Sequence, residues 1–382
     1  MTMLVELTRR AVSHPQTATF VKRAVAIKHG NGEEVELPTW GIVVVYLTVL
    51  VGSVAFSLVS YMLNHVITSL SMVESPMAAI TVTPSAQEPS AKEGEKETLL
   101  ETGPTIALVN QKPITSSIRA TIRHLVANAG RFARFRGYRI HIVYSLLNSL
   151  VFTFFNGALD FLPGQAILSA AFSGALLARI HAVWTHKVVG MPTEQSFCQR
   201  IPNKSHWKTL ALPAAIASAM PYISMYLTAG LVMLLGFDDM EPVTTCAQKM
   251  GVIARVLGVA IFAITCTLFL CLPALVTRVR IEASILPDDQ DAIVPFDRTF
   301  GGKVVSKMMG GSGVVGFLDA WKSFNWEARR RLIKLYIKNF FILTGMLLVF
   351  FHIVAFETFA IMGPAVGKLM AQMKHDGMDG GV

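Results

Sequence analysis

Long apolar runs are the feature that most constrains what this chain can fold into. A helix rises about 1.5 Å per residue, so about 20 apolar residues cross a bilayer core with every backbone polar group bonded internally. Runs of that length recur along the 382 residues, and polar segments separate them. Only 15% of the residues are charged, against about a quarter in soluble proteins. The sequence therefore predicts an integral membrane protein and excludes a cytosolic enzyme, a nucleic-acid-binding domain and a secreted disulfide scaffold.

The runs predict an all-α fold, a polytopic transmembrane helix bundle with about six spans and two basic amphipathic surface helices. Pro213 and Pro221 predict that the fourth span is kinked or broken. The predicted order is a basic N-terminal tail (1–40), transmembrane helix 1 (41–64), a disordered polar loop (65–113), an amphipathic basic helix (114–139), a transmembrane hairpin (140–186), transmembrane helices 4 and 5 (209–277), a loop with a glycine-rich hinge and a second amphipathic basic helix (278–338), transmembrane helix 6 (339–362) and a C-terminal tail (363–382).

Two segments outside the spans combine an apolar stripe with basic residues. In the first, apolar side chains from Ile118 to Phe132 recur at helical spacing while arginines take the other face. The second repeats this pattern from Phe317 to Leu335. Such helices lie on membrane surfaces and attract anionic lipid. The residues predicted to bind lipid are Arg119, Arg123, Arg131, Arg134, Lys322, Arg329, Arg330 and Lys334.

The distribution of cations predicts the orientation. The segments before span two, between spans three and four, and between spans five and six hold 24 Lys and Arg, whereas the opposite side holds 8. The positive-inside rule therefore directs these three segments to the cytosol, where the sequon at Asn203 would stay unused. Lys22, Arg23 and Lys28 give span one the reverse preference.

Localisation has two interpretations. The first is a multi-pass protein of the secretory pathway or the plasma membrane. The alternative is a mitochondrial membrane, because the first 32 residues hold five cations against the single acidic residue Glu6, a composition typical of a transit peptide.

Ionisable residues inside the spans are the candidates for a transport pathway, because each costs about 2.5 to 3.5 kcal/mol at the bilayer centre. They are Glu357, His352, Arg255, Arg179 and Asp160. Glu357 has no cation one turn away on its own helix, so it needs a partner from another span or a proton. The alternative interpretation is that these residues form structural polar bridges or reach the interface. We identify no catalytic signature, and we expect neither a metal site nor a cofactor.

Small residues predict where helices approach closely. Small side chains let membrane helices pack backbone to backbone. We therefore expect tight helix contacts at three places: Ser169, Ser173 and Gly174 in span three, Ala254 and Gly258 in span five, and Gly363 with Gly367 just beyond span six.

The stretch Arg280–Val304, RIEASILPDDQDAIVPFDRTFGGKV, resembles a loop of fungal multi-pass integral membrane proteins that have no assigned biochemical activity. The resemblance covers this loop and the general layout only. It implies a fungal polytopic protein and transfers no functional residue.

The sequence thus favours a non-enzymatic transporter or permease-like protein for a small solute, ion or proton. The alternative is a membrane scaffold or membrane-shaping protein that binds anionic lipid through its basic helices. A lipid-modifying enzyme is a third possibility. The expected partners are membrane lipids, with a homo-oligomer or a membrane partner protein left open and nucleic acid excluded.

Overall fold

The computed structural model describes residues 39–75, 78–83, 105–110, 112–237, 246–287, 289–305, 311 and 313–362. The predicted N-terminal tail before residue 39 and the C-terminal tail from 363 lie outside these residues. The helices are α3 (Thr39–Tyr61), a π-helical turn (Met62–Ile67), α4 (Thr68–Val73), α5 (Ile118–Ala129), α6 (Tyr138–Ala158), α7 (Gln165–Leu176), α8 (Ala178–Val189), α9 (Trp207–Leu234), α10 (Cys246–Cys266), a second π-helical turn (Thr267–Cys271), α11 (Leu272–Ser284), α12 (Phe317–Lys322) and α13 (Trp326–Met362). Short 3₁₀ turns span Ile114–Ser116, Arg131–Phe135, Cys198–Arg200 and Lys204–His206.

Five helical segments of the described chain are long and apolar enough to cross a membrane: Trp40–Val73, Arg131–Ala158, Lys204–Leu234, Gln248–Ser284 and Trp326–Ile361. The pair α7 and α8 makes a sixth if it counts as one span. The predicted all-α polytopic fold is confirmed, and the chain is an integral membrane protein.

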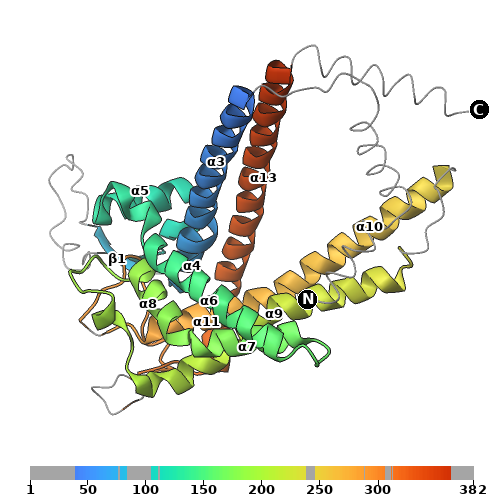
Figure 1. The fold of residues 1–382 in the computed structure, drawn as a ribbon. Helices are drawn as coiled ribbons and strands as arrows, with labels where there is room; N and C mark the ends of the chain where they lie inside the picture. Colours follow the sequence, from blue (N-terminus) through green and yellow to red (C-terminus); the bar gives the residue numbers. More distant parts are fainter. Residues whose placement is uncertain are drawn as a thin grey trace, which may run out of the picture.

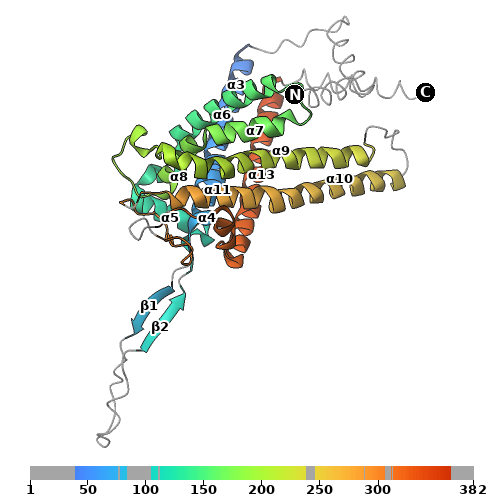
Figure 2. The same ribbon diagram turned by 90° about the horizontal axis from the view of Figure 1, so that it is seen from below.

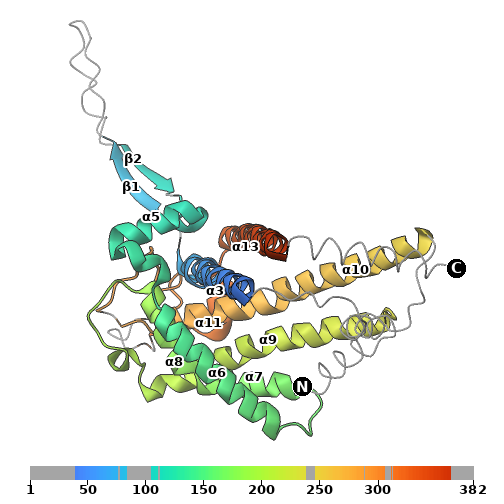
Figure 3. The same ribbon diagram turned by 45° about the horizontal axis from the view of Figure 1, so that its top comes forward.

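The long helices leave a common base and splay apart. Figure 1 shows α3 running beside α13, while α9 runs beside α10 in another direction. Figure 2 shows α6, α7, α9 and α10 side by side in one layer. At the base, α4, α5, α8, α11, α12 and the first turns of α13 (residues 326–338) pack together, and we call this assembly the hub. Figure 1 shows α4, α5, α8 and α11 there, and Figure 3 shows α5, α8 and α11 from another side.

The buried core lies in the hub rather than along the spans. Its largest cluster joins residues of α4, α8, α11 and α13, among them Met72 and Leu332, with Phe324 from the turn between α12 and α13. By contrast, Val51 of α3 and Phe351 of α13 are each more than half exposed. Apolar surface on a spanning helix faces lipid without a penalty, so the spans need little protein around them.

Backbone hydrogen bonds tie together the three segments that the cation count assigns to one side. Ser75 N donates to Pro295 O at 2.9 Å, and Met191 N donates to Asp291 O at 2.7 Å. The ends of three separate interhelical segments therefore meet in the hub. Their common side agrees with the cation count, and their direction toward the cytosol stays a prediction.

Three helices are longer than the sequence predicted. The first continues past Asn64 to Val73, α11 continues past Thr277 to Ser284, and α13 begins at Trp326 rather than Asn339. The prediction ended each span where charged or polar residues begin. In the structure these residues form hydrogen bonds within the hub, so the helices continue beyond their apolar stretch. The second predicted surface helix is thus divided between α12 and the first turns of α13.

The predicted amphipathic helix over 114–139 is shorter than expected. It ends at Ala129, because Gly130 has φ +82° and Gly137 has φ +77°, conformations that favour glycine and interrupt the helix. Its apolar stripe packs on the hub, where Leu125 is fully buried and Ile118 and Ile122 contact the main core cluster. The exposed face carries the arginines.

The third span is bent and the fourth is continuous. The chain turns by 63° between α7 and α8, which directs the polar residues of α8 into the hub instead of into lipid. Helix α9 carries Pro213 and Pro221 inside one helix, so a break at these prolines is wrong, while the alternative of a kink stays a prediction. It packs against α7, α8, α10 and α11, and such neighbours compensate for the backbone groups that proline leaves unpaired.

The predicted disordered loop over 65–113 contains an antiparallel pair of strands, β1 (Ala78–Thr83) and β2 (Thr105–Asn110). The hairpin projects from the hub (Figure 2). Its register pairs Ile80 with Leu108 and Val82 with Ile106, residue types that favour strands. The prediction missed this short signal beside the Ser, Pro and Glu-rich sequence of 84–104, which lies outside the described residues.

Candidate functional site

Charged side chains gather inside the hub, in contrast to the apolar lengths of α3, α6, α9, α10 and α13 outside it, which we call the arms. Arg278, Arg280 and Glu282 of α11 are each at most 5% exposed, and Glu74 at the end of α4 is 2% exposed. Groups of this kind are costly to bury unless they are paired and hydrogen-bonded. Each of them therefore needs partners. Arg278 and Glu282 find them in one network and Glu74 in a second. Arg280 instead donates to the Met72 carbonyl at 3.0 Å and to the Ser323 hydroxyl at 3.1 Å.

The first network surrounds the Glu282 carboxylate between α8 and α11. His181 Nδ1 lies 2.8 Å from both carboxylate oxygens, and the Thr185 hydroxyl donates to Oε2. Arg278 Nε, one turn earlier on α11, donates to Oε1 at 3.0 Å. His186 Nε2 lies 2.8 Å from the Glu282 carbonyl oxygen. The carboxylate is thus fully occupied, and the network holds α8 against α11.

An aromatic cluster borders this network. Trp184 Nε1 donates to the Tyr61 hydroxyl at 2.9 Å, and this hydroxyl donates to the Arg136 carbonyl at 2.7 Å. The His65 and His141 rings lie 4.4 Å apart between centroids, beside Trp184. His65 lies in the π-helical turn, a geometry that often marks functional positions. Among the described residues, no group of three or more His, Cys, Asp or Glu is arranged to hold a metal ion.

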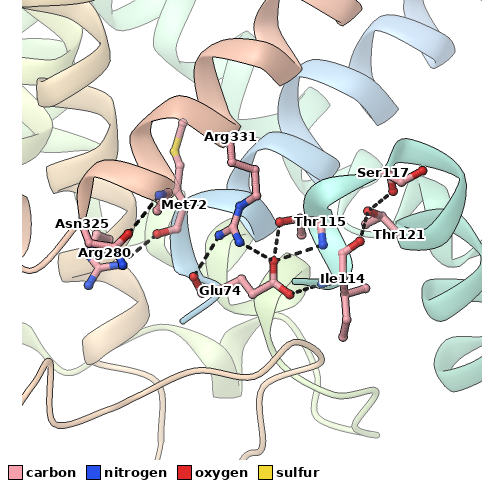
Figure 4. A network of polar contacts seen from close by, with 10 residues as sticks. Met72, Glu74, Ile114, Thr115, Ser117, Thr121, Arg280, Asn325 and Arg331 are labelled. Carbon is pink, nitrogen blue, oxygen red and sulfur yellow. Dashed lines mark hydrogen bonds and ion pairs between the residues drawn. The ribbon is translucent and has the colours of Figure 1, made fainter. Parts of the chain in front are cut away.

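The second network surrounds Glu74 (Figure 4). Its carboxylate accepts hydrogen bonds from Ile114 N at 2.5 Å, from Thr115 N at 3.1 Å and from the Thr115 hydroxyl. Arg331 reaches from α13 to the same group, with Nη1 3.5 Å from Oε2 and Nη2 3.3 Å from the Glu74 carbonyl oxygen. Glu74 thereby fastens the chain after the β-hairpin to α4 and α13.

A basic pocket opens beside the Glu74 network, between residues 112–118 and the first turns of α13. It encloses about 510 Å³, which lies within the usual range of ligand sites. Its lining includes one acidic side chain, Glu327. The cations that line it are Lys112, Arg330, Arg331, Lys334 and Lys338. This concentration of positive charge suits an anion.

The predicted transport residues do not form one site. Glu357 lies beside a groove of about 740 Å³ between α3 and α13, where Oε1 accepts a hydrogen bond from the Thr48 hydroxyl at 3.0 Å. His352 lines the same groove, is exposed and bonds the Leu348 carbonyl of its own helix. The two residues therefore share a groove, although five positions separate them along α13.

The other three transport candidates lie apart from that groove. Arg179 on α8 donates to the Pro202 carbonyl at 2.7 and 2.9 Å. Arg255 on α10 donates to the Leu235 carbonyl at 3.1 Å, and Asp160 accepts a bond from Gln165 at 3.3 Å. These contacts support the interpretation of structural bridges, which lie near the ends of spans for Asp160 and Arg255 and at the bend between α7 and α8 for Arg179.

The predicted lipid-binding residues, unlike the transport candidates, all lie in one region, the hub and the turn after α5. Arg119, Arg123, Arg131, Arg134 and Lys322 are exposed. Arg330 and Lys334 line the basic pocket. Arg329 is half-buried, stacks over the Trp321 ring at 4.0 Å and bonds the carbonyls of Trp321 and Phe324, so its guanidinium already has partners.

Sequence reasoning missed the residues at the centre of the hub, Glu74 and Glu282, and the pocket cations Lys112, Arg331 and Lys338. It assigned Glu282 to a loop and did not consider its pairing. One signal was available, because Arg278 and Glu282 are four residues apart, the spacing of an ion pair on a helix.

Comparison with protein-family models finds no match for this sequence, and comparison with curated proteins finds no similar chain. The resemblance of residues 280–304 to fungal multi-pass membrane proteins stays a prediction.

Proposed function

We propose that this integral membrane protein acts as a membrane scaffold that binds anionic lipid headgroups with the basic surface of its hub. The observation that carries the proposal is the basic pocket, in which five cations face one acidic residue. The exposed arginines of α5 and of the turn that follows add positive charge in the same hub. Anionic lipid attracts juxtamembrane cations by about 1 kcal/mol each.

The position of the pocket along α13 supports the proposal. Ile337, Phe340 and Phe341 are more than half exposed, and they begin the apolar part of the helix. Lys338 lies among them, and Lys334 lies one turn before. A helix rises about 1.5 Å per residue, so Lys334 and Lys338 lie within about 11 Å of Phe341 along the axis. Headgroups occupy that depth next to the hydrocarbon.

The test compares the whole protein in nanodiscs of phosphatidylcholine with and without phosphatidylserine, by its apparent melting temperature and by mass spectrometry of bound lipid. The test variant replaces Arg119, Arg123, Arg131 and Arg134 by Gln. We expect it to lose most of the stabilisation by phosphatidylserine. The control replaces Lys249 and Arg255, exposed cations on α10 away from the hub, and should keep it. Equal stabilisation of all three proteins by phosphatidylserine would rule out lipid binding by these arginines.

One observation favours transport of a proton or small ion as a second candidate. Glu357 Oε2 is shielded from solvent and has no hydrogen-bond partner among the described residues. A carboxylate oxygen in that state can take up a proton or hold a cation. In proteoliposomes, the proposal expects a pH-driven flux that Glu357→Gln abolishes and that Asp160→Asn leaves intact. A flux unchanged by Glu357→Gln would remove this candidate.

A further inference from the structure

We infer that the basic pocket between residues 112–118 and α13 is a discrete site for one lipid headgroup that carries two phosphate monoesters. The inference rests on the proposed function and narrows it, because general attraction to anionic lipid requires no pocket. Such a site would make the first turns of α13 selective for lipids that carry two phosphate monoesters.

The charge of the pocket determines the kind of headgroup. Arg331 is paired with Glu74, so the other four lining cations against Glu327 leave an excess of three positive charges. A phosphate monoester carries about 1.5 to 2 negative charges at neutral pH, so two monoesters are enough to neutralise this excess. A diester such as the phosphate of phosphatidylserine carries one charge and would leave most of the lysines unpaired.

The arrangement of the cations favours phosphate over a flat carboxylate. Lys334 and Lys338 lie one turn apart on α13, and Lys112 comes from another segment on the facing wall. All three are exposed and form no salt bridge with a carboxylate of the described residues. Lysine ammonium groups on separate walls can each meet a different phosphate oxygen.

Arg331 lines the pocket and holds its two walls together. Its guanidinium holds the Glu74 carboxylate, which in turn bonds the backbone of Ile114 and Thr115 (Figure 4). The segment that carries Lys112 is therefore fastened to α13 before a ligand arrives. A preformed site loses less conformational entropy on binding than one that must assemble.

The surroundings identify a lipid rather than a soluble phosphate. The helix face that carries Glu327, Arg331, Lys334 and Lys338 continues, at spacings of three and four residues, to Phe341. Phe341 is 67% exposed and lies at the start of the apolar stretch of α13. A ligand with phosphates among the lysines can place acyl chains along this face, and a free headgroup cannot.

The experiment uses the whole protein in phosphatidylcholine nanodiscs and measures the affinity for three probes. The probes are dioctanoyl phosphatidylinositol bisphosphate, dioctanoyl phosphatidylserine and soluble inositol trisphosphate. The pocket variant is Lys334→Gln with Lys338→Gln, and the matched control is Lys249→Gln with Arg255→Gln on α10. All four side chains are exposed, so folding should be preserved, and size-exclusion chromatography checks it.

We expect the bisphosphate lipid to bind at least tenfold more tightly than the other two probes. The pocket variant should lose at least tenfold of this affinity, and the control variant less than twofold. Equal losses in both variants would overturn the discrete site and leave the general attraction to anionic lipid standing. Binding of inositol trisphosphate as tight as that of the lipid would overturn the lipid as ligand. If no probe binds while the phosphatidylserine response of the arginines persists, only this inference fails, and if that response is also absent, the proposed function fails with it.

Discussion

Replacing Glu282 by Gln removes the charge of one member of a buried ion pair and keeps the shape of the side chain. Arg278 Nε lies 3.0 Å from the Glu282 carboxylate, and the two side chains are 6% and 1% exposed. Two charges about 4 Å apart attract each other by about 4 kcal/mol at an effective dielectric constant of about 20. Breaking one side of a buried pair costs about 3 to 5 kcal/mol in measured cases. We expect Glu282→Gln to destabilise the protein by about that amount, because Arg278 stays charged and buried.

A second variant separates lost charge pairing from lost packing. The double substitution Glu282→Gln with Arg278→Met removes both charges, while the amide oxygen introduced at position 282 can still accept a hydrogen bond from Thr185. It should be more stable than Glu282→Gln alone, since no unpaired charge remains. The measurement is the apparent melting temperature in detergent by fluorescence-detected size-exclusion chromatography, with the exposed Glu194→Gln as control. A double variant as unstable as the single one, or a single variant as stable as the control, would refute the argument.

Three further predictions concern helix packing, topology and the Glu74 network. A Cβ on Gly174 would lie 2.7 Å from the Ala214 carbonyl oxygen of the neighbouring α9, whereas the nearest atoms to a Cβ on Gly52 belong to the Phe350 ring, which can rotate. Gly174→Ala should therefore destabilise the protein by about 1 to 3 kcal/mol through overpacking, and its apparent melting temperature should be lower than that of Gly52→Ala. In a cysteine-free background, Ser196→Cys and Asp160→Cys should react with an impermeant thiol reagent from opposite sides of the membrane, and labelling from the same side would contradict the topology. Glu74→Ala removes the acceptor of two backbone amides, so hydrogen exchange should accelerate in the chain that leads into α5, and unchanged exchange would show that the contact is dispensable.

The spans were predictable because the bilayer imposes one length and one kind of surface. The ends of the helices that enter the hub were not predictable. A charged residue interrupts an apolar run both where a helix ends and where it continues into a protein core. Arg280 is an example: it looked like the start of a loop, yet its guanidinium is buried, bonds the Met72 carbonyl at 3.0 Å and lies over the Phe300 and Phe324 rings. Only tertiary structure brings those partners together.

The candidate site was predictable in part for the same reason. The basic stripes were visible, and two of the predicted lipid-binding residues, Arg330 and Lys334, line the pocket. The prediction placed the apolar stripes of the two basic helices against the membrane surface, whereas Leu125 and Leu335 of those stripes are buried in the hub. Helical periodicity identifies a buried face, and it does not say whether protein or lipid buries it. The tight contact predicted at Ser169, Ser173 and Gly174 is confirmed. The one predicted at Ala254 and Gly258 is wrong, because both residues are exposed and, within the described chain, nothing lies within 4 Å of a Cβ on Gly258. Gly363 and Gly367 lie outside the described residues.

Polar groups are distributed unevenly between the hub, the long helices outside it and the basic pocket, and this distribution indicates where a ligand would bind. Glu74, Glu282 and their buried partners lie in the hub, and each carboxylate is occupied by hydrogen bonds that hold helices together. The arms present apolar side chains outward, which anchors them in lipid. The pocket beside Glu74 differs from both regions, since it has charge in excess and space for a ligand. Lys112, Lys334 and Lys338 in the pocket form no salt bridge with a carboxylate of the described residues. An anion that binds there would gain charge pairs without breaking existing ones, so the pocket is where we expect a ligand to bind.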